Sequence, residues 1–526
     1  MRKRIIIDGK SLSIEKLVEV ARGNAYVTLS TQAERRVMLS RKTVEKWVSE
    51  HRKVYGITTG FGPMCDRSVV VSEARELQEN LIRSHSAGFG NPFPRDTVRA
   101  TMLLRANVLA KGYSGVRVHL LNTLLSMINR SIHPIIPEIG SVGASGDLVP
   151  LAHMALAMMG EGNVEYNGRV IEADSALKKE GIDKARLDSK EGIALINGTS
   201  VMTALGALAC YDSHRLVKEA EIAASMSIEA LKGAVDAFDE RIHSLRPHKG
   251  QIESAENFRK LLSGSQLVSS LERATRKQSR KESRETRDIK LQDAYSLRCS
   301  PQVYGAVRDA VAFVRKVIEI EMNSATDNPL ILSKSDEALH GGNFHGQPVA
   351  SAMDLLSISL TSVGNISERR TARLLDSSLN EGLPLFLVRG KGGVQMGLMG
   401  TQYTATSLAA ENRTLAHPAS IQSLPTNANN QDIVSMGTIG ARNASKILRN
   451  VECILAIEMI SAAQAIDLRG PEKLAKGTAK AHRMIRRVLP PIVEDRETYV
   501  DIAKLLEILE NGELVRAVES SVGKLN

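Results

Sequence analysis

Aromatic side chains are scarce in this chain of 526 residues, since Phe, Trp and Tyr together make up only 3% of it. Because 43% of the residues are nevertheless hydrophobic, Leu, Ile, Val, Ala and Met carry the apolar content. That mixture favours helix packing and argues against an aromatic-rich β-sandwich. The length and the apolar content suffice for a large hydrophobic core and for more than one domain.

Cysteine is also rare, because the chain has only four and no two of them form a Cys-x-x-Cys pair. Their wide spacing excludes a disulfide scaffold and a cysteine-based zinc site. We therefore expect free thiols and a cytoplasmic protein. The four are Cys65, Cys210, Cys299 and Cys453.

Long hydrophobic runs are the third feature that the sequence lacks. The N-terminal stretch is basic and has only three consecutive isoleucines, Ile5 to Ile7, which is too short for the apolar part of a secretory signal. No apolar run approaches the roughly 20 residues needed to cross a bilayer. The sequence therefore predicts no membrane insertion.

Acidic residues are outnumbered, since 69 Lys and Arg against 59 Asp and Glu leave a net charge of +10. Eight of the basic residues lie between Leu271 and Lys290, where four acidic residues alternate with them at helical spacing. No aromatic residue is interleaved there to stack on bases. The segment is typical of a solvated helix face or a loop, so we expect no nucleic-acid partner.

Helical periodicity is abundant, and strand-like runs are few and short. One exception is residues 164–173, where an Asn-Gly turn between β-branched runs predicts a hairpin. We predict a mainly α fold, with a smaller mixed N-terminal domain over residues 1–195 and long packed helices over residues 196–526, which form a central helical bundle and C-terminal helices. The long helical segments expected after Asn197 are Val201–Val235, Gln302–Asn323, Val349–Leu375, Thr401–Leu415 and Ile439–Ile466.

A short polar run, Gly140 to Gly146, holds three glycines and two serines in seven positions. Such a loop usually just ends an element of structure. This one, however, is one of eight polar stretches, most of them with glycine, that a helical scaffold alone does not require. The other seven begin at Tyr55, Asn80, Ile196, Leu291, Asn323, Gly341 and Leu424.

The order and wording of these eight stretches resemble the aromatic amino acid ammonia-lyases and aminomutases, which include the histidine, phenylalanine and tyrosine ammonia-lyases. The resemblance runs from about Ile7 to about Ala463. Eight motifs in the same order are far more specific than one short pattern. The resemblance implies an aromatic amino acid substrate and a homotetramer whose active sites combine residues from three subunits.

In that family the tripeptide at Ala144-Ser145-Gly146 cyclises on its own backbone and loses water, giving 4-methylidene-imidazol-5-one (MIO). The residue types suit this reaction, because a backbone free of bulky Cβ groups lets the amide of Gly146 approach the carbonyl of Ala144. Ser145 supplies the hydroxyl that is lost. The resemblance therefore implies MIO as the cofactor. It implies no metal and no nucleotide, and the sequence has no dinucleotide fingerprint, P-loop or His-Glu-x-x-His motif.

Ammonia elimination also needs a base for a β-proton that is scarcely acidic. By resemblance Tyr55 is this base, and its surroundings would have to lower the pKa of its phenol. Tyr295 corresponds to a second family tyrosine near the prosthetic group. Arg298 corresponds to the arginine whose planar fork pairs with the substrate carboxylate, with a structural salt bridge as the alternative.

Three further residues match positions around the prosthetic group. Asn197 matches the asparagine that hydrogen-bonds the MIO carbonyl, although it could instead cap the helix that follows Thr199. Phe344 matches a family aromatic, with a place in the core as the alternative. Gln292 is a further candidate for the same pocket.

Two positions bear on the choice of substrate, and they disagree. Ser84-His85 matches the pair found in histidine ammonia-lyases. Gln431-Asp432-Ile433 stands where those enzymes read Glu-Asp-His, and it lacks the carboxylate that would interact with an imidazole. Both features occur together in tyrosine 2,3-aminomutases, where His85 would bond the phenol hydroxyl. The balance favours tyrosine or phenylalanine, giving coumarate or cinnamate, with histidine and urocanate kept open.

Two other hypotheses accompany the lyase. A 2,3-aminomutase would return the amine to the β-carbon and release a β-amino acid, which depends on how long lid loops retain the arylacrylate. A non-catalytic basic binding protein on the same fold would use the charged segment at residues 271–290. We take the ammonia-lyase as the primary expectation.

Overall fold

The structure is a computed structural model that describes residues 2–67, 69–270 and 292–526. It divides into two compact units, each built from three separate segments of the chain. Unit 1 contains residues 1–211, 314–354 and 418–445, and unit 2 contains residues 212–313, 355–417 and 446–526. The division predicted after residue 195 stays a prediction, and the basic segment at residues 271–290 lies outside the described residues.

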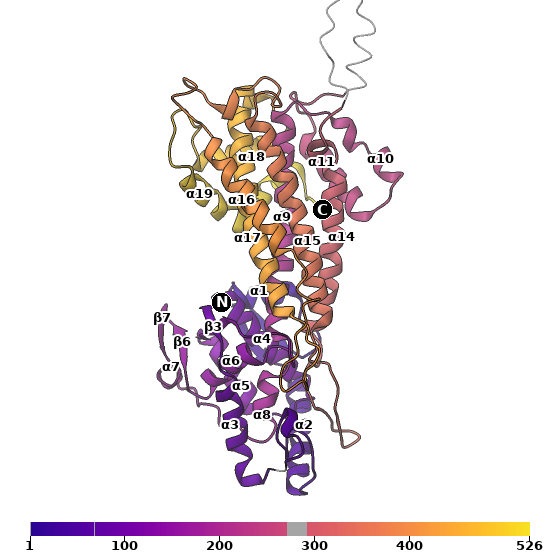
Figure 1. Cartoon of the computed structure of the whole chain (residues 1–526), viewed down its shortest axis with the longest axis vertical. Helices are drawn as coiled ribbons and strands as arrows, with labels where there is room; N and C mark the ends of the chain where they lie inside the picture. Colours follow the sequence, from indigo (N-terminus) through magenta and orange to yellow (C-terminus); the bar gives the residue numbers. More distant parts are fainter. Residues whose placement is uncertain (1, 68, 271–291) are drawn as a thin grey trace, which may run out of the picture. The chain divides into compact units, whose positions relative to one another are not determined.

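Helices dominate both units (Figure 1), which confirms the predicted mainly α fold. Five of them match the long segments expected from the sequence, and the boundaries between the units fall within four of these. The five are α9 (Ser200–Ala230), α14 (Ser300–Met322), α15 (Gln347–Leu375), α16 (Met399–Leu415) and α17 (Gly437–Arg469).

Unit 1 packs short helices against several small sheets. Its further helices are α1 (Ile14–Ala21), α2 (Thr31–Ser49), α3 (Ala74–His85), α4 (Arg95–Ala110), α5 (Val118–Asn129), α6 (Leu148–Met158), α7 (Ala173–Lys179) and α8 (Glu191–Ile196). Its strands are β1 (Arg4–Ile7), β2 (Tyr26–Leu29), β3 (Phe89–Pro92), β4 (Ile132–Pro134), β5 (Pro137–Ile139), β6 (Asn163–Tyr166), β7 (Arg169–Glu172), β8 (Leu330–Leu332) and β9 (Glu337–Leu339).

The described strands form sheets of only two or three members. β1 pairs with β2 in parallel, whereas β3–β5, β4–β6–β7 and β8–β9 are antiparallel. β6 and β7 are the hairpin predicted around the Asn-Gly turn. Sheets this small organise loops rather than a core, so the helices build the hydrophobic interior.

α4 is the central helix of unit 1, because fourteen of its sixteen side chains are buried. Two of the buried side chains, Arg99 and Arg105, are arginines on an otherwise mostly apolar helix. The helix ends at Ala110, and Gly112 follows with a φ of +81°. A Cβ on Gly112 would lie 2.5 Å from the Cβ of Arg36, so glycine is required where the chain leaves the helix, as the sequence predicted.

Unit 2 contains long helices that run side by side, joined by buried polar contacts. Arg370 on α15 donates to Glu458 on α17 and to the hydroxyl of Tyr304 on α14, each at 2.5 Å. Burial raises the pKa of Tyr304, so its hydroxyl stays protonated. The remaining helices of unit 2 are α10 (Glu240–Ser244), α11 (Lys249–Leu262), α13 (Tyr295–Arg298), α18 (Lys476–Val488), α19 (Thr498–Glu510) and α20 (Glu513–Val522).

α15 alone among the described helices is long and apolar enough to cross a membrane by length and composition. It passes on its average composition and holds no unbroken apolar run of that length, so the absence of membrane insertion stays a prediction. Moreover, 67% of its most apolar window is buried inside the protein, as in the core helix of a globular protein.

Candidate active site

A cavity of about 800 Å³ lies within unit 1, and it brings together most of the residues predicted from the sequence. α3, the loop after Val54, the 140–146 run, the loop before α15 and the loop before α17 all contribute to its wall. The predicted residues that line it are Tyr55, Ser84, His85, Ala144, Ser145, Asn197, Phe344 and Gln431.

The 140–146 run forms a tight turn at this cavity. Gly143 and Gly146 pair with each other as an antiparallel bridge, so the chain folds back on itself across Ala144 and Ser145. Ser145 has a φ of +50°, in a region that non-glycine residues rarely adopt. A Cβ on Gly143 would lie 2.2 Å from Ser435 Oγ, and one on Gly146 would lie 2.2 Å from the carbonyl oxygen of Gly198. The turn therefore requires both glycines.

Hydrogen bonds hold Ser145 at both ends. The amide of Gly198 donates to the Ser145 carbonyl oxygen at 3.1 Å. Gln431 Nε2 donates to Ser145 Oγ at 3.1 Å, while Gln431 Oε1 accepts from Thr426 Oγ1 at 3.0 Å. The side chain of Gln431 is thus engaged by the turn on one side and by its own loop on the other.

Asp147, which the sequence analysis did not single out, anchors the turn to α9. Its side chain is fully buried and accepts from the amides of Val201 and Met202 at 2.8 and 3.0 Å. It also accepts from Ser141 Oγ at 3.0 Å and from Thr438 Oγ1. Burial raises the pKa of Asp147, and these donated hydrogen bonds oppose that effect. The sequence signal that could have identified Asp147 is its position directly after the Ala144-Ser145-Gly146 tripeptide.

Asn197 follows α8 and does not cap α9, because Asp147 performs that role. The Asn197 Nδ2 donates to the carbonyl oxygen of Asn328 at 3.0 Å. Its Oδ1 is buried and has no hydrogen-bond partner. The backbone oxygen of Asn197 accepts at 2.7 Å from Arg105, a second residue that the sequence analysis missed.

Tyr55 is half-buried at the cavity wall, with its ring edge-on to Phe61 and His340 at centroid distances of 6.4 and 5.9 Å. Its phenol oxygen accepts from the amide of Gly62 at 3.0 Å. A hydrogen bond donated to this oxygen stabilises negative charge on it. The loop thus supplies an interaction that a catalytic tyrosinate needs.

His85 is the last residue of α3, and its hydrogen bonds define the tautomer of its ring. Nδ1 lies 2.9 Å from the carbonyl oxygen of Leu81, which can only accept. Nδ1 therefore carries the hydrogen, and Nε2 is a hydrogen-bond acceptor in the neutral ring. Ser84 Oγ donates to the same carbonyl at 3.1 Å. The pair thus presents an acceptor nitrogen at the cavity wall.

Three predicted residues, Gln292, Tyr295 and Arg298, belong to unit 2 and do not line this cavity. Arg298 donates to the backbone oxygen of Asp293 and to Gln292 Oε1, each at 3.0 Å. Its guanidinium lies 4.7 Å from the ring centroid of Tyr295, which is 71% exposed. Within the described ranges Arg298 makes no salt bridge, so the structural alternative for it lacks an acidic partner here.

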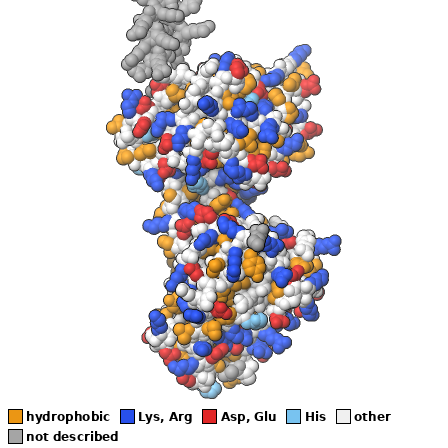
Figure 2. All heavy atoms as spheres, turned by 180° about the vertical axis from the view of Figure 1, so that it is seen from behind, with side chains coloured by type: hydrophobic (Ala, Val, Ile, Leu, Met, Phe, Trp, Pro, Cys, Tyr) orange, Lys and Arg blue, Asp and Glu red, His pale blue; other side chains and the backbone are white. Residues whose placement is uncertain are grey.

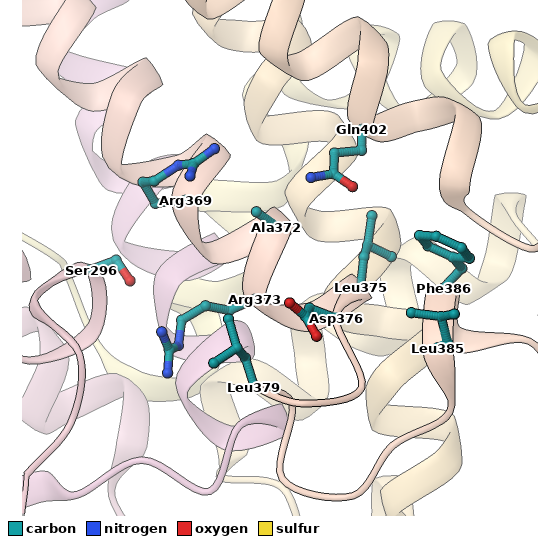
Figure 3. A pocket seen from close by; sticks show the side chains of 10 residues that line it. All are labelled: Ser296, Arg369, Ala372, Arg373, Leu375, Asp376, Leu379, Leu385, Phe386 and Gln402. Atoms are coloured by element: carbon teal, nitrogen blue, oxygen red, sulfur yellow. The ribbon is translucent and has the colours of Figure 1, made fainter.

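A second hollow, of about 670 Å³, lies in unit 2 beside α13 (Figure 3). Ser296 borders it, together with Arg369 and Arg373 from α15. Leu385 and Phe386 line it as well, and the left-handed φ of +52° at Phe386 marks a sharp bend there. The turn that carries Tyr295 and Arg298 therefore stands at the edge of a recess lined by two arginines and by Asp376.

Surface charges of both signs are interspersed over the face seen in Figure 2. That face offers no extensive single-sign patch for a polyanion. Among the residues that the structure describes, no three His, Cys, Asp or Glu side chains gather as a metal site would require.

Comparison with known proteins agrees with the geometry. The family model described as aromatic amino acid lyase matches residues 12–487. A protein named histidine ammonia-lyase from Caldanaerobacter subterraneus subsp. tengcongensis is 50% identical over 512 residues, covering 97% of each chain. The crystal structure of a tyrosine aminomutase from Streptomyces globisporus superposes with a TM-score of 0.95 at 43% identity, covering 99% of this chain and all of the other.

A third relative is the histidine ammonia-lyase from Trypanosoma cruzi, whose structure has a TM-score of 0.89 at 39% identity, with 99% and 96% of the two chains covered. The chain belongs to the aromatic amino acid lyase family. It is accordingly a carbon–nitrogen lyase, as the sequence predicted.

Proposed function

We propose that this enzyme eliminates ammonia from L-histidine and releases trans-urocanate. The cavity of unit 1 carries the proposal, because the Ala144-Ser145-Gly146 turn, Tyr55 and His85 line one space large enough for an amino acid. The name of the relative that shares half of its residues supports histidine as the substrate. This choice departs from the balance drawn from the sequence, which favoured tyrosine or phenylalanine.

The residues around the turn fit MIO as the prosthetic group. Gly143 and Gly146 leave no room for side chains, and Ser145 adopts a strained φ. When formed from Ala144, Ser145 and Gly146, the group supplies an electrophile that converts the substrate amine into a better leaving group. No ordinary side chain offers that chemistry.

The other residues of the cavity act on protons and on position. Tyr55 takes the β-proton at its phenol oxygen, and the Gly62 amide donates to this oxygen and so stabilises the anionic form that accepts the proton. Asn197 keeps one amide hydrogen on the Asn328 carbonyl and has a second for an oxygen of the prosthetic group. Phe344 provides an apolar wall that limits access of water to the reacting atoms.

His85 selects a substrate ring that carries a hydrogen-bond donor. Its Nε2 accepts, because Nδ1–H is committed to the Leu81 carbonyl. An imidazole N–H or a phenol O–H can donate to Nε2, whereas a phenyl ring cannot. A buried acceptor left without a donor costs about 1–3 kcal/mol, so phenylalanine is expected to be the poorest of the three substrates.

Tyrosine is the second candidate substrate. Gln431 stands where histidine ammonia-lyases have a carboxylate, and its amide is already engaged by Ser145 and Thr426. The imidazole of histidine therefore lacks a charge-assisted partner at this position. The solved tyrosine aminomutase at 43% identity supports the same candidate, and it keeps the β-amino acid product open.

The carboxylate-binding part of the site is proposed to come from another copy of the chain. Arg298, Tyr295 and Gln292 form one cluster in unit 2, and none of them lines the cavity of unit 1. The large exposure of Tyr295 is consistent with a contact that forms on assembly. A homotetramer would supply this contact by symmetry.

The deciding experiment incubates purified enzyme separately with histidine, tyrosine and phenylalanine and follows urocanate, coumarate and cinnamate by absorbance. β-Amino acids are sought by chromatography in the same reactions. Faster urocanate release is expected. Faster coumarate release would replace histidine by tyrosine, and steady accumulation of a β-amino acid would make the enzyme an aminomutase.

We place the enzyme in the cytoplasm, consistent with four cysteines that form no disulfide among the described residues. Membership of the lyase family argues against the non-catalytic basic binding protein, and residues 271–290, on which that hypothesis depends, lie outside the described residues. Salt-sensitive nucleic-acid binding that survives Ser145→Ala, together with no turnover of any of the three amino acids, would favour it.

A further inference from the structure

Arg105 is a fully buried cation directly beneath the candidate site. It lies on α4, and its Nη1 donates to the backbone oxygen of Asn197 at 2.7 Å. Its Nε and Nη2 have no hydrogen-bond partner. Within the described part of the chain, no carboxylate comes within 4.0 Å of its guanidinium, because the buried Asp327 pairs with Lys190 at 2.6 Å instead.

Such an arrangement is costly for the folded state. Desolvation lowers the pKa of Arg105 to about 10, which still leaves it charged at neutral pH. A buried charge with no carboxylate within ion-pairing distance is costly, and the negative charges of the buried Asp327 and Asp147 offset that cost only in part. Its position one residue from the cavity wall suggests a role in the chemistry.

The group that Arg105 contacts links it to Ser145 through a single peptide bond. The carbonyl of the Asn197–Gly198 peptide accepts from Arg105, and the N–H of the same peptide donates to the Ser145 carbonyl oxygen at 3.1 Å. A charged donor on an amide oxygen polarises the amide and strengthens its N–H as a donor.

Gly198 permits this close approach. A Cβ at that position would lie 2.9 Å from Arg105 Nη1 and 2.5 Å from Thr326 Oγ1. The backbone there also has a φ of +139°, which L side chains rarely adopt. Side-chain packing thus leaves the guanidinium aligned with the peptide and not with a carboxylate.

The loss of water from Ser145 builds up negative charge on the Ser145 carbonyl oxygen, which accepts from the Gly198 amide. Ring closure joins Gly146 N to the carbonyl carbon of Ala144 and releases that carbonyl oxygen as water, with the amide hydrogens of Gly146 and Ser145. In a second loss of water, Ser145 gives up its Cα hydrogen and its hydroxyl as a carbon–carbon double bond forms. Departure of the Cα proton places negative charge on the Ser145 carbonyl oxygen, opposite the Gly198 N–H.

We propose that Arg105 is a positioning residue that promotes the dehydration of Ser145 by polarising the Asn197–Gly198 peptide. This inference rests on the proposed function, since it presupposes that Ser145 loses water. Arg105 lies on the core helix α4 and does not contact the substrate. Its role would be to strengthen the hydrogen bond from the Gly198 amide to the Ser145 carbonyl oxygen.

The test measures the rate at which Ser145 loses water when chains recovered unfolded and uncyclised from inclusion bodies are refolded, by mass spectrometry of the peptide that contains Ala144 to Gly146. Arg105→Gln is expected to slow the loss about tenfold or more, and Arg105→Lys about threefold, because lysine keeps the charge but ends short of the Asn197 oxygen. Absorbance of the conjugated product follows the same rate independently of turnover.

Arg99→Gln is the matched control. Arg99 is also a buried arginine of α4, and it donates to the backbone oxygens of Val20 and Ile128 at 2.9 and 3.0 Å, away from Ser145. Both variants are expected to lower the thermal midpoint, and only the change at Arg105 is expected to slow the loss of water. Equal slowing by Arg99→Gln would assign the effect to general destabilisation and overturn the proposal.

A folded Arg105→Gln chain that loses water at the wild-type rate would also overturn it. If Arg105→Gln fails to fold, Arg105→Lys is tested in its place. A folded Arg105→Lys chain that loses water from Ser145 at the wild-type rate would then overturn the proposal. Failure of the proposed function is distinguishable, because the wild-type chain itself would then lose no water from Ser145 and would turn over none of the three amino acids.

Discussion

The cavity of unit 1 and the Tyr295–Arg298 turn of unit 2 contrast in how completely each is built. In the cavity, Ser145 and Tyr55 are each held by a backbone amide, from Gly198 and Gly62 respectively. In unit 2, Arg298 is held by its own segment, and Tyr295 stands 71% exposed. One region is preorganised for chemistry within a single chain, and the other is rigid but open. The difference is the one expected under the proposal that another copy of the chain completes the site.

The largest expected effect is loss of the reactive turn. Ser145→Ala removes the hydroxyl that must leave, and activity is expected to fall by about 10³-fold or more. Mass spectrometry should show an unaltered linear peptide, and circular dichroism should show an unchanged fold, because the side chain adds little to the core. Residual activity within tenfold of the wild type would contradict the assignment of the cavity as the active site.

The comparison between the two regions is tested most directly by mixing inactive chains. Tyr55→Phe and Tyr295→Phe are each expected to lower kcat by about 10²–10⁴-fold. If the two tyrosines of one site come from different copies, co-expression of the two variants restores about a quarter of the sites, for random mixing of chains. Steady-state activity of the co-purified oligomer measures the recovery.

Tyr55→Phe co-expressed with Ser145→Ala is the matched control for this experiment. Both residues line the cavity of unit 1 within one chain, so every site carries one of the two defects and no recovery is expected. Recovery in this control, or none in the first mixture, would show that the division of the site between copies is wrong.

A smaller effect is expected from substitution of His85, which is proposed to hydrogen-bond the substrate ring. His85→Leu removes the Nε2 acceptor and should lower kcat/KM for histidine and tyrosine by about tenfold, while phenylalanine changes little. Ser84→Ala serves as control, because Ser84 Oγ donates to the Leu81 backbone oxygen and can only accept from Nδ1–H of its histidine neighbour. An equal loss for all three substrates would indicate a structural role for His85.

The sequence predicted the helices and the composition of the cavity, because both depend on local patterns. Periodicity identified α14 and α15, and the motif wording identified Tyr55 and Asn197. Asp147 and Arg105 were missed for the same physical reason: each acts through backbone groups far away in the chain, which no local pattern encodes. The substrate position Gln431 was found, but its bond to Ser145 could only come from the fold.

The sequence also could not show how burial shifts the pKa of charged side chains in the two regions. Burial lowers the pKa of Arg105 in unit 1, whereas unit 2 buries Glu452, which pairs with Arg215 at 2.5 Å and lies 3.5 Å from Arg449. Desolvation raises the pKa of Glu452 to about 7; these two arginines oppose the shift, and the neighbouring Asp212 and Glu510 add to it.

The last predicted effect, on stability and not on activity, follows from this titration. A raised pKa in the folded state means that Glu452 contributes stability that is complete below about pH 4.5 and is lost as the pH rises through about 7. The wild type should therefore lose up to about 3 kcal/mol between pH 5 and pH 8 relative to Glu452→Gln, measured from thermal midpoints at equal protein concentration. Glu411→Gln is the control, because Lys446 lowers the pKa of Glu411 and this carboxylate is ionised across that range. A difference between wild type and Glu452→Gln that is independent of pH would mean that Glu452 is already ionised at pH 5, and that its arginine neighbours outweigh its burial.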